Sequence, residues 1–224
     1  DKPLELKDIL DFCWNDGSLY LVTSQGLFES RIVRKTEGKH DFVLCLLNPE
    51  PVVRGKVAHL CSDGKTNLYF SVNQRKVVHY DLVAKKTSLI KEYSVVNRLF
   101  LRHGYLWICR LWDDIICYDL KTNEERVISM EGKDQSEFSN SYVTDLVLKD
   151  NRTFYLTTWN GLYKLRFDND NLCKSPFVLT LLTKNEKAFH SSIENKMTSL
   201  FWDDKQQILW VGTFGGGRSE ERRV

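Results

Sequence analysis

The sequence lacks an excess of charge of either sign, and it lacks any long apolar run. Its 32 basic and 30 acidic residues leave a net charge of +2 over 224 residues, so charge favours no polyanionic partner and we expect no nucleic-acid binding. No stretch approaches the roughly 18 apolar residues of a membrane-spanning helix, and no secretory signal peptide opens the chain. Because the chain begins at Asp1 rather than at methionine, we expect it to be a segment of a longer protein.

Sustained helical periodicity and metal-binding motifs are also missing. His59 and Cys61 share a strand face, but two ligands do not make a metal site, and we expect none. The cysteines show no Cys-x-x-Cys pair, and each lies in or beside an apolar run, which favours small buried side chains: Cys13, Cys45, Cys61, Cys109, Cys117 and Cys173. Cys109 and Cys117 flank one predicted turn, and the turn's length decides whether they face each other. The cysteines therefore neither require nor exclude an oxidising compartment.

What the sequence does contain is a repeated pair of apolar runs. The chain is 42% hydrophobic and 12% aromatic, which suffices for a sizeable core. In residues 195–217 (NKMTSLFWDDKQQILWVGTFGGG), an apolar run, a polar turn and a second apolar run precede glycines, a pattern typical of strand, turn and strand. Copies of the second run share the order apolar, aromatic, apolar, small, then Thr or a substitute: residues 19–23, 68–72, 106–110, 154–158 and 209–213.

These copies divide the chain into repeats of about 45 residues, each predicting four consecutive strands separated by turns such as Asp16-Gly17. The repeats are expected at residues 9–47, 56–92, 95–130, 142–182 and, incompletely, 197–224. Their strands are apolar on both faces, so each sheet must be covered on both, which radial stacking of similar sheets accomplishes. The sequence therefore predicts an all-β protein, a β-propeller of four-stranded antiparallel blades, in which residues 1–224 form a single domain or segment.

The fifth repeat departs from this pattern. A third strand is due after the glycines at 215–217, yet residues 218–224 (RSEERRV) have almost no apolar face to bury. The interpretation that we favour is that the chain ends inside a larger propeller. The alternative is that residues 3–7 form a strand that completes the last blade of a five-bladed ring. In the first case, blades one and five would each expose an apolar sheet face.

Residues 140–165 (NSYVTDLVLKDNRTFYLTTWNGLYKL) and 194–217 (ENKMTSLFWDDKQQILWVGTFGGG) resemble the two-component-regulator propeller repeat. The family's form is roughly Asn, Val, two further positions, an apolar residue, an acidic residue, Gly, Leu-Trp-Ile-Gly-Thr and then Gly-Gly or Gly-Leu. The match is strong in repeats four and five, moderate in one and three, and weak in two. Gly212 keeps the glycine expected before threonine. The other copies carry a different residue there: Val22, Ser71, Cys109 and Thr157.

This resemblance implies the periplasmic sensor region of a hybrid two-component system histidine kinase, typical of bacteria that degrade polysaccharides. Such a region would detect glycan fragments and regulate polysaccharide-utilisation genes through a kinase and a DNA-binding regulator further along the same polypeptide. The implied partners are an oligosaccharide or other small ligand, the remaining propeller and kinase parts of the polypeptide, and a second copy in a homodimer. No cofactor is expected.

In a propeller, the turns between second and third strands lie on the same side as the connections between blades. Aligning the repeats therefore gathers aromatic and polar side chains on one rim, where an aromatic face can stack on a sugar ring and polar groups can bind its hydroxyls. The candidate ligand-binding residues are Trp112, Trp159, Phe214, Arg110, Asp113, Asn160 and Gln25. The alternative is that Trp159 and Phe214 pack between blades.

Other motifs favour structure over chemistry. Asp81, Asp119 and Asp168 end third strands, where a carboxylate can accept N–H groups of a turn. The glycine-rich run at 212–217 lacks the Gly-Lys-Ser/Thr ending of a phosphate loop, and no catalytic Ser/His/Asp or paired-carboxylate arrangement stands out. We therefore expect a sensor; the alternatives are a lyase-like propeller enzyme and a protein-interaction scaffold. Four tryptophans lie inside strands and are expected in the core: Trp14, Trp107, Trp202 and Trp210.

Overall fold

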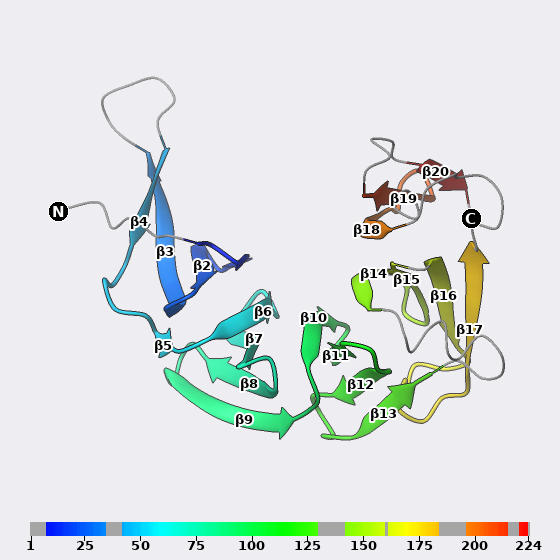
Figure 1. Cartoon of the computed structure of the whole chain (residues 1–224), viewed down its shortest axis with the longest axis horizontal. Coiled ribbons are helices and arrows are strands. Elements are labelled where there is room, and N and C mark those ends of the chain that lie inside the picture. The colour runs from blue at the N-terminus through cyan, green and yellow to red at the C-terminus, as the bar shows by residue number, and fades with distance from the viewer. Residues whose placement is uncertain are drawn as a thin grey trace. The chain divides into compact units, whose positions relative to one another are not determined.

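All regular structure in the described part of the chain is β-strand. The structure, a computed structural model, describes residues 8–34, 42–129, 142–159, 161–183, 196–214 and 220–223. Within each sheet the strands follow one another in chain order, which Figure 1 shows as a steady change of colour. These residues contain no helix with the length and hydropathy that crossing a lipid bilayer requires. The chain divides into two compact units, Asp1–Leu101 and Arg102–Val224.

Unit one holds two antiparallel sheets and nearly all of the strand that starts a third. The first sheet pairs in the order β1-β2-β3-β4, with the short β5 pairing to β3, and the second in the order β6-β7-β8-β9. The strands are β1 (Asp11–Asn15), β2 (Ser18–Thr23), β3 (Gly26–Arg34), β4 (Phe42–Leu46), β5 (Val53–Arg54), β6 (Val57–Ser62), β7 (Asn67–Val72), β8 (Lys76–Asp81), β9 (Lys86–Glu92) and β10 (Val96–Arg102).

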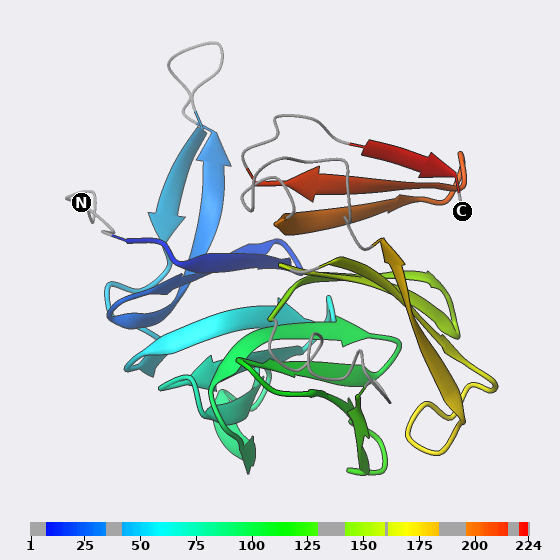
Figure 2. The ribbon, with the colours of Figure 1, turned by 45° about the vertical axis from the view of Figure 1, so that its right-hand side comes forward.

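Unit two begins at the last residue of β10 and carries the rest of the third sheet, in the order β10-β11-β12-β13. A fourth sheet, β14-β15-β16-β17, and a three-stranded fifth sheet, β18-β19-β20, follow; the fifth runs from orange to red in Figure 2. The strands are β11 (Tyr105–Arg110), β12 (Ile115–Asp119), β13 (Glu125–Ile128), β14 (Val143–Asp150), β15 (Thr153–Thr158), β16 (Gly161–Phe167), β17 (Phe177–Thr183), β18 (Met197–Asp203), β19 (Ile208–Thr213) and β20 (Glu220–Arg223).

Two-residue turns set the register of the hairpins that the sequence signals most clearly. Asn15 pairs with Ser18, leaving Asp16 and Gly17 as the turn with φ angles of 41° and 79°. Positive φ at both central residues is the condition for the turn type that matches strand twist, and Asp-Gly meets it at low cost. The five copies of the second apolar run each form the second strand of a sheet, namely β2, β7, β11, β15 and β19, as the repeats predict.

Two strands were not predicted. β5 lies between the first two predicted repeats, 9–47 and 56–92, and its backbone pairs with Gly26 and Leu27. β20 forms in the charged segment at 218–224 and pairs with β19 from Ile208 to Val211. A strand at a sheet edge needs backbone hydrogen bonds but no apolar side chains, and charged side chains are usual there. The strand expected at residues 3–7 lies outside the described residues.

Neighbouring sheets pack face to face through clusters of buried side chains. In unit one, Tyr20, Val22 and Leu27 of the first sheet pack with six residues of the second: Val57, Leu60, Leu68, Phe70, Val78 and Tyr80. In unit two, Tyr155 and Leu162 of the fourth sheet pack with four residues of the fifth: Met197, Leu200, Leu209 and Val211. Burying one such large apolar side chain contributes about 1.5 to 3 kcal/mol, so these interfaces hold each unit together.

The four strand tryptophans do not share one environment. Trp107 is fully buried, and its ring centroid lies 4.6 Å from that of Phe154, which confirms its place in the core. Trp202 and Trp210 are half-buried. The expectation that Trp14 lies in the core is wrong, because Trp14 is 55% exposed. Successive strand residues face opposite sides, and on β1 Cys13 faces the core cluster while Trp14 faces away from it.

Exposed apolar side chains occur on the first strands of the first and fifth sheets. Phe12 and Trp14 of β1 are exposed, and so is Phe201 of β18.

Two of the three third-strand aspartates accept N–H groups of a turn, as expected. The Oδ1 atom of Asp81 accepts two such groups at 2.8 and 2.9 Å. That of Asp119 accepts two at 2.8 and 3.3 Å.

Cys109 and Cys117, the pair suspected from the sequence, do not stand opposite each other in their hairpin. Cys109 stands opposite Ile115, and Cys117 stands opposite Trp107. The connection between β11 and β12 is therefore shorter than the one that would align the two thiols, and the two residues are offset by two positions along the ladder. All six cysteines are free thiols in this structure.

A carboxylate on the first strand of one sheet binds the first strand of the next. The Oδ2 atom of Asp11 on β1 accepts the N–H of Leu60 on β6 at 2.8 Å. In unit two, the Oδ2 atom of Asp145 on β14 accepts the N–H of Leu200 on β18 at 2.7 Å. The strands that donate these N–H groups, β6 and β18, each carry a β-bulge beside the bound amide, and a bulge frees a backbone group from its own ladder. We refer to these two contacts as the carboxylate clamps.

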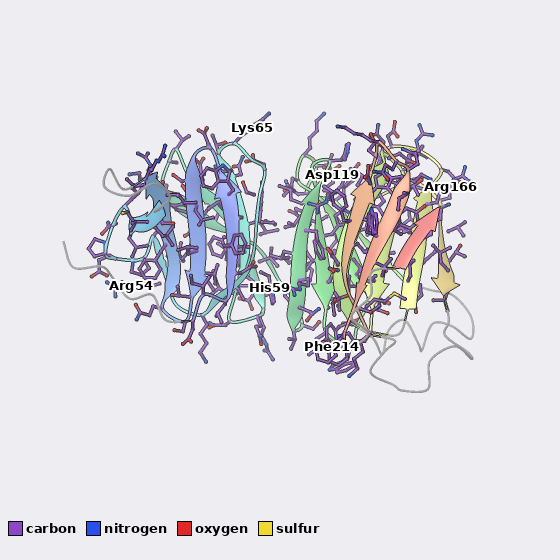
Figure 3. All side chains as sticks on the ribbon, turned by 90° about the horizontal axis from the view of Figure 1, so that it is seen from above. Arg54, His59, Lys65, Asp119, Arg166 and Phe214 are labelled. Carbon is purple, nitrogen blue, oxygen red and sulfur yellow. The ribbon has the colours of Figure 1, made fainter. Side chains whose placement is uncertain are left out.

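On β6, His59 occupies the position that corresponds to Asp11 on β1. His59 precedes Cys61 by two residues, as Asp11 precedes Cys13, and these two cysteines face Tyr69 and Tyr20 of their own sheets. The His59 backbone has φ of 56°, and the residue stands on β6 beside the bulge (Figure 3). Burial and the charge of Arg98 together lower the pKa of His59 to about 4, although a hydrogen bond to the backbone of Val96 opposes the shift.

We predict that His59 makes the protein acid-sensitive between pH 6.5 and 4. In this window the unfolded chain binds a proton on His59, with an ordinary pKa near 6.5, whereas the folded protein does not. His59 should therefore leave the free energy of unfolding unchanged above pH 6.5 and lower it by about 3 kcal/mol by pH 4. Urea titrations of His59→Asn should lack most of this fall, since asparagine tolerates the positive φ. His103→Asn, at an exposed turn, should keep it, and an unchanged slope in His59→Asn would contradict the assignment.

Candidate functional site

One edge of unit two gathers aromatic side chains from three successive sheets. In an antiparallel meander, the start of the first strand and the end of the second lie at the same edge. Here this edge holds the β11–β12 turn, the starts of β14 and β18, and the ends of β15 and β19. The N–H of Phe214 donates to the carbonyl of Lys196 at 2.7 Å, which joins two of these points. We call the resulting set the aromatic rim: Trp112, Tyr142, Trp159, Lys196 and Phe214.

The rings of the aromatic rim form a chain of contacts. The centroids of Tyr142 and Trp159 are 4.2 Å apart with an interplanar angle of 52°. Trp112 meets Tyr142 edge to face, with centroids 6.2 Å apart. The ammonium of Lys196 lies 4.4 Å from the centre of the Trp159 ring, a cation–π contact. These contacts hold Trp159 and Tyr142 in place and leave Trp112 at one end.

Two rings of the rim are available to a ligand. Trp112 and Phe214 are each 59% exposed, whereas Trp159 is 36% exposed. Figure 3 shows Phe214 at the lower edge of the unit, beyond the ends of its strands. Trp159 therefore combines the two roles considered from the sequence, because it packs on Tyr142 and Lys196 and still presents part of its ring. Exposed aromatic faces beside fixed polar groups are typical of saccharide-binding surfaces.

Polar groups brace the turn that carries Trp112. A guanidinium nitrogen of Arg110 lies 2.7 Å from a carboxylate oxygen of Asp113, and the Arg110 Nε donates to the carbonyl of Asp114 at 3.1 Å. Trp112 stands at the tip of this turn with φ of 58°. The Oδ1 atom of Asp114 is buried without a hydrogen-bond partner among the described residues. Burial and the charge of Asp113 raise the pKa of Asp114, and Arg110 opposes them.

The structure brings five of the seven candidate residues into unit two at or beside this rim. Trp112, Arg110 and Asp113 lie at one turn, and Trp159 and Phe214 directly follow β15 and β19. Asn160 lies outside the described residues. Gln25 belongs to unit one, where its exposed turn joins β2 to β3 and its carbonyl accepts the N–H of Gly55 at 3.3 Å. Sequence reasoning missed Tyr142 and Lys196, which precede the first strands of their sheets; an aromatic or basic residue directly before such a strand was the available signal.

A second surface feature lies at the opposite ends of the same strands. A cavity of about 270 Å³ is lined by the β14–β15 turn and the end of β16: Lys149, Asp150, Arg152, Thr153, Lys164, Arg166, Phe167 and Asp168. Arg152 is already paired with Asp170 at 2.7 Å. The remaining basic groups, Lys149, Lys164 and Arg166, line the cavity together with the carboxylates of Asp150 and Asp168. No group of three potential metal ligands occurs in the part of the chain that the structure describes.

Comparison with known proteins identifies the fold. No family model matches the chain, and no curated protein matches its sequence. Solved structures do match. The extracellular domain of the putative hybrid two component system BT4673 from B. thetaiotaomicron aligns with 97% of this chain at 17% identity and a TM-score of 0.62. The β-propeller domain of Myceliophteria thermophila Cps50 (Swd1) aligns with 92% at 14% identity and a TM-score of 0.58.

A third match is the Mitotic Checkpoint Complex, which aligns with 96% of this chain at 15% identity and a TM-score of 0.64. These likenesses confirm the all-β propeller fold that the repeats predict. The chain spans 28% of the BT4673 chain, 62% of the Cps50 chain and 63% of the checkpoint chain. At such identities the likeness concerns the fold, and none of the three shows which residues of this chain bind a ligand.

We predict that the stability of tryptophan variants follows burial in the structure. Trp107→Ala should lower the free energy of unfolding by about 3 to 5 kcal/mol, because it leaves a cavity among packed rings. Trp112→Ala should change it by less than about 1 kcal/mol, since surface substitutions usually have small effects. Trp14→Ala is the matched control for an exposed strand tryptophan and should also be mild. Urea denaturation measures all three; a Trp112 variant as unstable as the Trp107 variant would make Trp112 a packing residue.

Proposed function

We propose that this chain is part of the ligand-sensing propeller of an extracytoplasmic receptor, and that its ligand is a glycan fragment. The observation that carries the proposal is the aromatic rim, where the exposed rings of Trp112 and Phe214 lie at the same edge as the Arg110–Asp113 pair. Stacked aromatic rings recognise the C–H face of a sugar, and the charged pair can bind hydroxyl groups.

The likeness to BT4673 supports the sensor role. That protein is described as a putative hybrid two component system, and the matched part is its extracellular domain. By analogy, we propose that this chain belongs to the periplasmic region of a longer polypeptide whose histidine kinase controls polysaccharide-utilisation genes. The same analogy proposes a homodimer, because paired sensor regions are a means of bringing two kinases together. Fold likeness alone does not specify function, so the proposal depends on binding experiments.

A glycan-binding assay with matched variants tests the proposal. Wild-type protein should retain members of an oligosaccharide library, and Trp112→Ala and Phe214→Ala should each weaken binding by roughly 3- to 10-fold, the value of one aromatic stacking contact. Trp14→Ala removes an equally exposed tryptophan from unit one and should bind as wild type. Equal loss in all three variants, or none in the two rim variants, would refute the rim assignment. Formation of cleaved products would favour the lyase-like enzyme.

A further inference from the structure

The loop between β16 and β17, residues 168–176, docks on the third sheet. The hydroxyl of Tyr105 on β11 donates to the carbonyl of Asp170 at 3.1 Å and accepts the N–H of Leu172 at 3.3 Å. Leu172 is almost fully buried. Lys174 pairs with Glu124 at 2.8 Å. The loop of the fourth sheet is thus fixed to the third at several independent points.

The same loop carries Cys173 to Cys117 of the third sheet. The S–H of Cys173 donates to the carbonyl of Cys117 and to that of Glu124, each at 3.6 Å, so the Cys173 sulfur lies directly beside the Cys117 residue. Cys117 lies on β12 between Trp107 and Arg126. Arg126 also donates to the carbonyl of Ser175 in the loop, so the β12 and β13 side chains on this face point toward the loop.

We propose that Cys117 and Cys173 form a disulfide when the folded protein meets a small-molecule or protein disulfide. The cross-link would join the third sheet to the β16–β17 loop, where an ion pair and hydrogen bonds already hold the loop against the sheet. It does not depend on what the aromatic rim binds. Closeness of the two cysteine residues in the reduced protein is the condition for bridging without a large movement of the backbone.

The reaction balances through thiol–disulfide exchange. Cys173, the more exposed of the two, loses its proton and attacks the donor disulfide, which releases one donor thiolate and leaves a mixed disulfide. Cys117 then loses its proton and attacks the Cys173 sulfur, which releases the second donor thiolate. The two released thiolates take up the two protons, so the cysteine pair is oxidised by two electrons and the donor is reduced to two thiols.

Burial sets the rate of this reaction. It raises the pKa of Cys117, which lies fully inside the unit, and also that of Cys173. Because the thiolate is the attacking species, exchange should be slow at neutral pH and faster at alkaline pH. Once formed, the bond closes a long loop of chain and should stabilise the folded protein.

Oxidation of the full chain with oxidised glutathione at about pH 8.5 tests the proposal. The count of free thiols in denaturant should fall from six to four, and non-reducing peptide mapping should find the Cys117–Cys173 link. The melting temperature should fall by roughly 5 °C or more when dithiothreitol is added.

Variants make the test specific. Cys173→Ser keeps Cys117 in the core and should abolish both the cross-link and the effect of dithiothreitol, whereas Cys45→Ser, at an exposed thiol of β4, should keep both. Six free thiols after oxidation, a glutathione adduct that stops at Cys173, or a bridge between other cysteines would each overturn the proposal. Cys117→Ser is a second variant for peptide mapping, in case it alters stability through its buried position.

Discussion

A side-chain carboxylate that accepts a backbone N–H from the neighbouring sheet fixes how the sheets follow one another. Apolar packing holds sheets face to face, but it is non-directional and allows them to slide. The carboxylate clamps remove that freedom, because Asp11 binds one amide of β6 and Asp145 binds one amide of β18. Thr144 adds a second contact by donating to the carbonyl of Met197 at 2.7 Å. β1 and β6 of unit one, and β14 and β18 of unit two, are therefore each held in one relative register.

This register is what assembles the aromatic rim. When the first strands of the fourth and fifth sheets are aligned, Lys196 reaches the Trp159 ring and the end of β19 returns beside it. None of the rim rings needs a large movement to meet a ligand, because Tyr142 and Trp159 brace each other. The site is thus a consequence of repeated strand order, and its chemistry depends on which side chains occupy the positions at the edge.

Local patterns in the sequence predicted the strands and several rim positions. The features that these patterns did not predict depend on tertiary contacts. Paired apolar runs and turns such as Asp16-Gly17 identify strands because these signals act over a few residues. The exposure of Trp14 could not be inferred, because Trp14 shares the apolar face of β1 with Phe12, whereas the face that carries Asp11 and Cys13 packs against the second sheet. β20 depends on backbone pairing rather than on its own apolar face. The clamp from Asp145 and the contact of Cys117 with Cys173 join residues more than 50 positions apart, which no local pattern specifies.

Hydrogen exchange in Asp145→Ala measures the central role of the carboxylate clamp most directly. Without the carboxylate, the amide of Leu200 should exchange much faster, followed by its neighbours in β18, while protection in β11 to β13 stays close to wild type. Asp203→Ala is the control, because Asp203 accepts N–H groups of Lys205 and Gln206 within its own sheet and its loss should affect that turn alone. Unchanged exchange at Leu200, or equal acceleration throughout unit two, would contradict the account.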